Sequence, residues 1–265
     1  MALIECNFWS DTLGTHSTML VIVPNRRYVR QPGQSGDSER TLPEGKLPTL
    51  YLLHGLGDDH TSWLRRTRVE EYANAVGVAV VMPNAGRSFY ANMDRGHDYW
   101  TFVGRELPYV AQSLFPLSGR REDCFVAGNS MGGYGAFKLA LAYPDRFAAA
   151  ASLSGVLDIA YRADPQWREF VNIFGDLNAL AGSPNDLLHL ADRAAASGGP
   201  VPLLYQCCGT ADFLYEHNER FAAHARRLGL PLAYDEEKES HNWAYWDRQI
   251  ARVIDWLPID SASTS

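Results

Sequence analysis

The chain has 265 residues, of which 46% are hydrophobic and 21% charged, and its formal net charge is −7. This composition supplies enough apolar material for a folded core and differs from that of disordered chains. The acidic balance argues against nucleic acid and anionic membrane as partners, because both are bound by clustered lysines and arginines.

The sequence also predicts where the protein resides and what it binds. No run approaches the 18 or so apolar residues of a membrane span. The first residues include Glu5 and no basic segment, which is unlike a secretory signal, although a leader lost from the chain is an open alternative. Four cysteines occur without the spacing of a zinc site: Cys6, Cys124, Cys207 and Cys208. We expect a cytoplasmic protein with reduced thiols, no metal and no cofactor.

In chain order, two strands are predicted first, at residues 2–9 and 17–23, from their β-branched and aromatic content. Residues 30–46 combine glycine, proline, serine and charge without periodicity, which predicts an exposed loop. Short apolar runs then alternate with helical patterns. The predicted strands are 47–55, 76–83, 124–130, 147–155, 201–209 and 231–239, and the predicted helices are 62–76, 98–115 with an interruption near Pro108, 131–143, 213–229 and 242–257.

This alternation predicts an α/β protein with a mostly parallel central sheet and helices on both faces. It breaks between residues 156 and 199, where we expect a small cap-like insertion of short helices over the strand ends. We interpret residues 1–265 as one domain.

A candidate nucleophile lies between a predicted strand and a predicted helix. Gly128, Ser130 and Gly132 match G-x-S-x-G, the sharp turn that exposes a serine at the top of an α/β-hydrolase sheet. An ordinary glycine-rich turn is the alternative. The free N–H groups at a helix start favour negative charge, so the amide of Met131 is expected to face the oxyanion of a reacting acyl group.

A second oxyanion donor is predicted after the strand at 47–55. The turn His54-Gly55-Leu56-Gly57 could aim the Leu56 N–H at the same oxygen. A plain tight turn is the alternative, and we interpret His54 as structural.

A reacting serine needs a base, and the base needs an orienting carboxylate. In α/β-hydrolases the chain order is serine, acid, histidine. Among the histidines after Ser130, His241 falls in a loop at the end of a predicted strand, where functional residues gather. The others, His189, His217 and His224, fall in the irregular insertion or on a helix.

The acid is predicted to be Asp212, which follows the strand at 201–209. Its alternative role is a helix N-cap. Asp235 and Glu236 are rival acids, but both fall inside the next predicted strand. For the substrate pocket we expect Trp63, Tyr134, Leu214 and Trp243, whose apolar walls would suit a small acyl group, with core packing as the alternative.

Together these residues resemble the esterase family that includes esterase D, S-formylglutathione hydrolase, feruloyl and acetylxylan esterases and the antigen 85 mycolyltransferases. The bacterial tributyrin esterase (acetyl esterase) branch is the most similar. The matching segments are YLLHGLGDDHTSW, MPNAGRSFYAN, FVAGNSMGGYGAFKLAL, CGTADFLYEHNERF and SHNWAYW.

The resemblance implies an α/β-hydrolase fold, the triad Ser130, Asp212 and His241, and cofactor-free hydrolysis of short acetyl to butyryl esters. It also implies a small-molecule ester as partner and association into a homo-oligomer. The same triad would serve an S-formylglutathione thioesterase, a carbohydrate acetyl or feruloyl esterase, or an acyltransferase. A hydrolase fold that acts only as a binding module is a further alternative.

Overall fold

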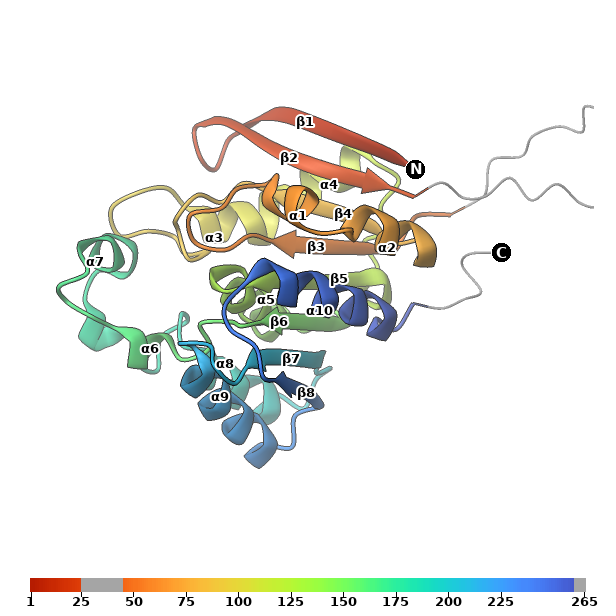
Figure 1. The fold of residues 1–265 in the computed structure, drawn as a ribbon. Helices are drawn as coiled ribbons and strands as arrows, with labels where there is room; N and C mark the ends of the chain where they lie inside the picture. The colour runs from red at the N-terminus through yellow and green to blue at the C-terminus, as the bar shows by residue number, and fades with distance from the viewer. Residues whose placement is uncertain (25–44, 260–265) are drawn as a thin grey trace, which may run out of the picture.

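The computed structural model describes residues 1–24 and 45–259, apart from the side chain of Arg162. Eight strands form one sheet in the order β1-β2-β4-β3-β5-β6-β7-β8 (Figure 1). The strands are β1 (Ala2–Ser10), β2 (Thr15–Val23), β3 (Thr49–Leu53), β4 (Ala79–Pro83), β5 (Cys124–Asn129), β6 (Ala149–Leu153), β7 (Leu203–Gly209) and β8 (Leu232–Glu237). Of the loop predicted at residues 30–46, all but 45 and 46 lie outside the described residues.

The sheet is mostly parallel, which confirms the predicted fold class. β1 and β2 form an antiparallel hairpin, and β2 is antiparallel to β4. The remaining neighbours all run parallel. Strands β3 to β6 are buried along their whole length. Burial on both faces explains why these strands read as continuous apolar runs rather than alternating ones.

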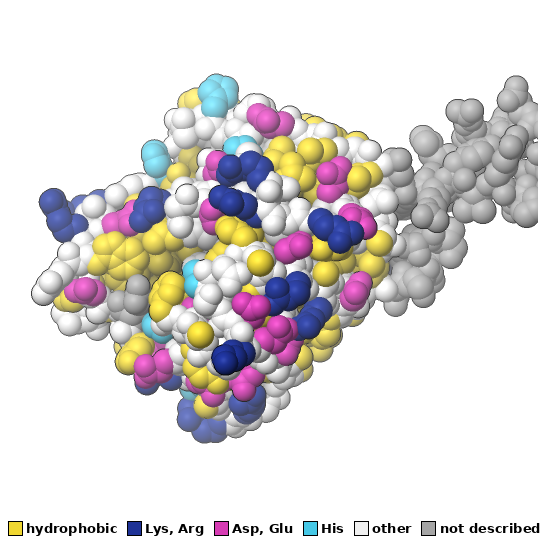
Figure 2. Space-filling view, viewed as in Figure 1, with side chains coloured by type: hydrophobic (Ala, Val, Ile, Leu, Met, Phe, Trp, Pro, Cys, Tyr) yellow, Lys and Arg dark blue, Asp and Glu magenta, His cyan; other side chains and the backbone are white. Residues whose placement is uncertain are grey.

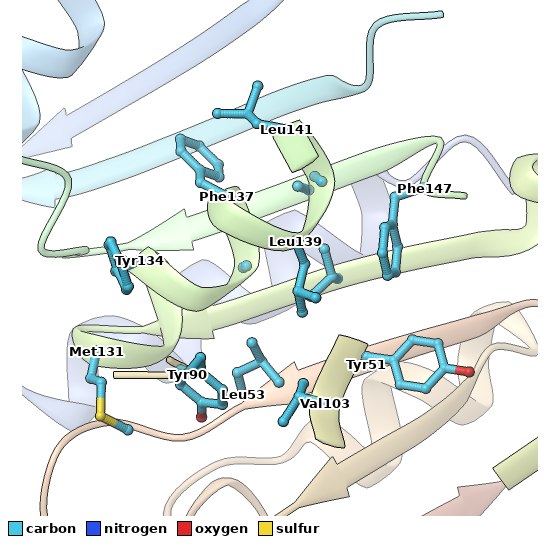
Figure 3. Close-up of a cluster of buried hydrophobic side chains, with 14 of the residues drawn as sticks. Tyr51, Leu53, Tyr90, Val103, Met131, Tyr134, Phe137, Leu139, Leu141 and Phe147 are labelled. Carbon is cyan, nitrogen blue, oxygen red and sulfur yellow. The ribbon is translucent and has the colours of Figure 1, made fainter. Parts of the chain in front are cut away.

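Helices cover both faces of the sheet (Figure 1). On one face lie α1 (Ser62–Arg66), α2 (Val69–Val76) and α10 (Trp243–Trp256), which enclose one hydrophobic core. On the other lie α4 (Leu107–Leu114), α5 (Met131–Ala142), α8 (Leu187–Ala196) and α9 (Tyr215–Arg227), around a larger core. Figure 3 shows this core around α5, from Met131 at the helix start to Phe147 beyond its end. None of the helices in the described ranges is long and apolar enough to cross a bilayer.

The prediction of a single helix at residues 62–76 is wrong, because two helices, α1 and α2, occupy this range. Thr67 is extended, with φ −138° and ψ 170°. Its hydroxyl donates to the Trp63 carbonyl at 2.6 Å and accepts from the Val69 amide at 3.2 Å. A threonine side chain that bonds nearby backbone groups competes with helix continuation.

The interruption predicted near Pro108 takes the form of one wide turn. The short helix α3 (Tyr99–Thr101) continues into a π-helical turn at Phe102–Glu106 and then into α4, with Pro108 in its first turn. Proline lacks the N–H that a helix interior needs, and its ring crowds the carbonyl four residues earlier, so the helical chain cannot keep its regular hydrogen bonding on approaching Pro108.

The predicted insertion at residues 156–199 contains α6 (Ile159–Arg162), α7 (Arg168–Phe174), a 3₁₀ turn (Leu177–Ala179) and α8. In Figure 1, α6 and α7 lie beyond the carboxyl ends of the parallel strands, as expected. The insertion contacts the segment that follows β4. Arg87 pairs bidentately with Glu169, with Nε–Oε1 at 2.5 Å and Nη2–Oε2 at 2.7 Å, and Phe89 packs on Phe170 at 5.5 Å.

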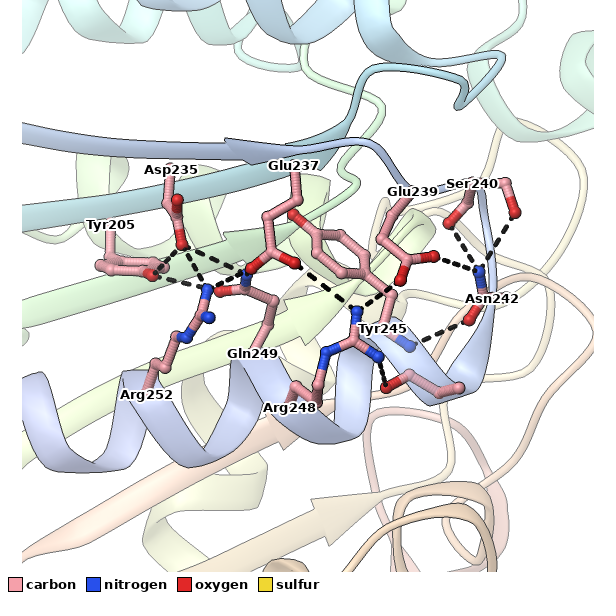
Figure 4. A network of polar contacts seen from close by, with 11 residues as sticks. Tyr205, Asp235, Glu237, Glu239, Ser240, Asn242, Tyr245, Arg248, Gln249 and Arg252 are labelled. Atoms are coloured by element: carbon pink, nitrogen blue, oxygen red, sulfur yellow. Dashed lines mark hydrogen bonds and ion pairs between the residues drawn. The ribbon is translucent and has the colours of Figure 1, made fainter.

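A polar network joins the edge strand β8 to α10 (Figure 4). Arg252 contacts Asp235 at 2.8 Å and also Glu237, and Arg248 contacts Glu239 at 2.5 Å. Acidic and basic side chains are interspersed over β8 and α10 on the face in Figure 2. The network fixes the start of α10 against the end of β8, and the loop between them carries His241.

Candidate active site

Ser130 occupies a strained turn between β5 and α5. Its φ is 53° and its ψ −117°, a region that costs a residue with a side chain roughly 1–3 kcal/mol. The flanking residues must be glycine, because a Cβ at Gly132 would lie 2.3 Å from the Leu53 carbonyl oxygen. A Cβ at Gly128 would lie 2.4 Å from the Gly132 carbonyl carbon. The turn is held by the Ser130 N–H, which donates to the Leu153 carbonyl at 2.9 Å.

The two predicted oxyanion donors are backbone amides at strand ends. Met131 is the first residue of α5, so its N–H has no acceptor within the helix. Leu56 is half-buried in the turn after β3. Within the described part of the chain, neither amide donates a hydrogen bond to another backbone group. Their role toward a substrate stays a prediction.

His54 has the contacts of a structural residue. Its Nε2 accepts from the Ala85 amide at 3.0 Å, so the ring proton is on Nδ1, which donates to the Gly55 carbonyl at 2.9 Å. Burial lowers the pKa of His54, which favours this neutral form. The ring thereby fixes the turn that carries Leu56.

Asp212 and His241, from the ends of two neighbouring parallel strands, meet at the same edge of the sheet. Oδ2 of Asp212 lies 2.8 Å from Nδ1 of His241. The Asp212 side chain is fully buried and that of His241 is 19% exposed. The other carboxylate oxygen accepts from the Leu214 amide at 2.9 Å. Both oxygens are therefore engaged, and the carboxylate holds the imidazole in one orientation.

Two aromatic residues around His241 were not predicted from the sequence. Phe213 packs on the imidazole with centroids 4.6 Å apart and is itself 63% exposed. Trp246 contacts the ring at 4.8 Å with an interplanar angle of 89° and is buried. Trp246 shares the apolar face of α10 with ordinary core residues, so helical periodicity alone could not have distinguished it. Nothing in the sequence pattern around Phe213, apart from its position after Asp212, indicated a contact with His241.

Trp246 also connects the histidine side of the site to the serine side. Its indole N–H donates to the Ser154 hydroxyl at 3.2 Å. Ser154 follows Leu153, whose carbonyl accepts from Ser130, and its φ of 48° ends β6 in a sharp turn. The ends of β5 and β6 and the start of α10 are thus joined by hydrogen bonds.

The predicted pocket residues are mostly deep in the protein. Trp63 is 1% exposed, and its indole N–H donates to the Leu53 carbonyl at 2.9 Å. Tyr134 is fully buried, with its hydroxyl 2.8 Å from the Asn185 carbonyl oxygen, and Leu214 is 1% exposed. Trp243 is half-buried against Trp63 at 5.1 Å. Contact of these four with a substrate stays a prediction.

The rival residues have other partners. His217 contacts the Asp158 carbonyl at 3.1 Å, and His224 pairs with Asp192 at 2.9 Å. Asp235 is paired with Arg252. Across residues 1–24 and 45–259, no group of three or more His, Cys, Asp or Glu side chains is arranged to hold a metal ion.

Comparison with known proteins identifies the family. The model of the family described as "Putative esterase" matches residues 39–257, and the chain belongs to this family. Acetyl esterase of Caldicellulosiruptor saccharolyticus is 33% identical over 267 residues, which cover 97% of this chain and 98% of the relative. S-formylglutathione hydrolase of Paracoccus denitrificans is 29% identical over 50% of this chain and 54% of the relative.

Two solved structures are similar to this chain over nearly its whole length. The fluorophosphonate-binding serine hydrolase FphF of Staphylococcus aureus has a TM-score of 0.86 and 39% identity, covering 98% of this chain and 99% of its own. The S-formylglutathione hydrolase FrmB of Staphylococcus aureus has a TM-score of 0.83 and 39% identity, covering 97% and 98%. The protein is a carboxylic ester hydrolase with an α/β-hydrolase fold.

Proposed function

We propose that this protein is a serine carboxylesterase that hydrolyses short acetyl to butyryl esters through Ser130, His241 and Asp212. The observation that carries the proposal is the 2.8 Å contact between His241 Nδ1 and the buried Asp212 carboxylate. The full-length similarity to an acetyl esterase supports the short acyl group.

The contact supports one position for the proton of the His241 imidazole. An ionised carboxylate only accepts hydrogen bonds, so the proton of neutral His241 resides on Nδ1. Nε2 then carries the lone pair and acts as the base. When His241 takes the proton of Ser130, the imidazolium that forms is stabilised by the carboxylate of Asp212.

The reaction proceeds in two halves. Ser130 Oγ attacks the ester carbonyl, and the amides of Met131 and Leu56 stabilise the oxyanion. His241 returns the proton to the departing alcohol, which leaves an acyl-enzyme. Water, deprotonated by His241, then attacks the acyl carbon and releases the acid and Ser130.

The test is hydrolysis of p-nitrophenyl acetate, butyrate, octanoate and palmitate by the wild type and Ser130→Ala. We expect the highest kcat/KM on acetate or butyrate and loss of turnover in the variant, with unchanged thermal unfolding. A maximum on palmitate would contradict the short acyl group. Undiminished turnover by Ser130→Ala would contradict the nucleophile.

A second candidate is hydrolysis of the thioester S-formylglutathione, which the similarity to the Staphylococcus aureus hydrolase supports. The same serine and oxyanion donors would act on a formyl thioester, so the triad does not separate the two. Direct comparison of kcat/KM for S-formylglutathione and for phenyl acetate does separate them. A ratio far above one in favour of the thioester would make it the principal substrate.

A further inference from the structure

Phe213 is an exposed aromatic residue in contact with the proposed base, His241. It is 63% exposed, and its ring centroid lies 4.6 Å from that of the imidazole at an interplanar angle of 49°. Single apolar residues on a protein surface are common, so the exposure of Phe213 alone indicates nothing. Its place beside the base does, because a group that approaches His241 from solvent also approaches this ring.

The backbone holds Phe213 in place from both sides. Its neighbours Asp212 and Leu214 are buried. The Asp212 N–H donates to the Gly209 carbonyl at 3.0 Å, and the Asp212 carbonyl accepts from the Tyr215 N–H at 3.0 Å. The Asp212 carboxylate accepts from the Leu214 N–H at 2.9 Å. A ring carried on a turn that is already fixed binds a partner with little further loss of conformational freedom.

The contacts of His241 indicate where the alcohol of the ester leaves. Nδ1 is bound to Asp212 at 2.8 Å, so Nε2 returns the proton to the departing alcohol. The alcohol oxygen must therefore come within hydrogen-bond reach of Nε2. The rings of Trp246 and Phe213 both contact the imidazole, but Trp246 is only 4% exposed. The substituent on the alcohol oxygen consequently meets Phe213.

We propose that the exposed ring of Phe213 binds the alcohol part of the ester, and that this part carries an aromatic ring close to its hydroxyl group, as in benzyl alcohol. Tilted and offset pairs of aromatic rings are more favourable than the burial of their area alone. An aromatic substituent therefore gains more from contact with Phe213 than a saturated ring of the same size. The proposal rests on the serine esterase function proposed above and adds the identity of the leaving group, which the triad does not determine.

Competition between benzyl acetate and cyclohexylmethyl acetate in one reaction tests this binding. The two esters share their acyl group and nearly the same size of alcohol, and neither alcohol leaves readily without a proton from His241. The ratio of their rates of consumption, divided by the same ratio for alkaline hydrolysis, gives the enzyme's preference for the aromatic ring. We expect the wild type to prefer benzyl acetate and Phe213→Leu to reduce this preference by about 3- to 10-fold. Phe213→Tyr retains an aromatic ring and should keep the wild-type preference.

The preference distinguishes contact with the alcohol from support of His241. A misplaced imidazole slows both esters alike and leaves the preference unchanged. Trp9→Leu is the matched control, since Trp9 is 54% exposed and packs on another histidine, His16, at 5.3 Å in the hairpin at the far edge of the sheet. It should leave the preference at the wild-type value.

Three results would overturn the proposal. They are a wild type without preference for benzyl acetate, an equal preference in the wild type and Phe213→Leu, and a wild type that hydrolyses p-nitrophenyl acetate but neither of the two competing esters. A wild type inactive on p-nitrophenyl acetate as well would contradict the proposed esterase function itself, and the binding of an alcohol at Phe213 with it.

Discussion

The rings of Trp246 and His241 meet edge to face, 4.8 Å apart, while the Trp246 indole N–H is bound to Ser154 at 3.2 Å. Trp246 is thus held at the end of β6, next to the turn that carries Ser130, and its ring limits the motion of the imidazole. A side chain fixed by its own hydrogen bond is a better support for a reacting group than packing alone.

Trp246→Phe is expected to keep the ring contact and lose the hydrogen bond. The free energy of unfolding should fall by more than about 1 kcal/mol, because the smaller ring leaves a cavity in addition to the lost hydrogen bond. kcat should fall by roughly 10- to 100-fold with a smaller change in KM, because small misplacements of a reacting group are costly. Steady-state kinetics and denaturant unfolding measure both. Trp256→Phe, at the far end of α10 against Tyr205, is the control and should leave kcat unchanged.

Asp212→Asn is expected to lower kcat by about 10⁴, because the amide donates to Nδ1 and forces the imidazole into the wrong tautomer. Asp192→Asn is the matched control, since Asp192 also pairs with a histidine at 2.9 Å, away from Ser130. If the two variants lost equal activity, the orienting role of Asp212 would be wrong.

Gly132→Ala is expected to destabilise the protein by more than about 2 kcal/mol, although alanine is the better helix former by about 1 kcal/mol. The added Cβ would lie 2.3 Å from the Leu53 carbonyl oxygen, and backbone cannot move aside cheaply. Gly199→Ala meets only the Ser197 hydroxyl at 3.6 Å and should change the midpoint of urea unfolding little. Equal midpoints for the two variants would contradict the close approach at the turn.

Lys138 gives the stability a pH dependence. Its ammonium is fully buried in α5, 2.7 Å from Asn185 Oδ1 and 3.1 Å from the Tyr90 carbonyl, and burial lowers its pKa to about 7. In the unfolded chain the pKa of lysine is about 10.4, so between these two pKa values the unfolded state binds one proton more than the folded state. The contribution of Lys138 to stability therefore rises with pH from about 7 to 10. It is constant below that window, where both states are charged.

The comparison with Lys138→Met isolates this effect from other groups that titrate in the same window. Wild-type stability minus variant stability, from urea unfolding at pH 6, 7, 8, 9 and 10, should grow with pH. A flat difference from pH 7 to 10 would show that Lys138 keeps its ordinary pKa in the folded protein, and a declining difference would show that its pKa is raised; either would contradict the prediction.

The sequence predicted the strands of the sheet better than the details of the helices. Continuous apolar runs such as that of β3 identify strands buried on both faces, and the glycines around Ser130 reflect backbone contacts that only glycine allows. The helix break at Thr67 was missed, because it depends on a side-chain hydrogen bond to the backbone. The packing of Phe213 and Trp246 on His241 was missed as well, because periodicity shows that a residue is buried but not which residue it contacts.

The central claim is that Ser130 is the nucleophile, and a fluorophosphonate tests it independently of substrate choice. The serine oxygen attacks phosphorus, fluoride leaves, and the adduct is stable to peptide mapping. We predict one adduct per chain, located on Ser130, and none on Ser130→Ala at the same concentration and time. Stoichiometric labelling of Ser130→Ala, or an adduct mapped to another residue of the wild type, would contradict the account.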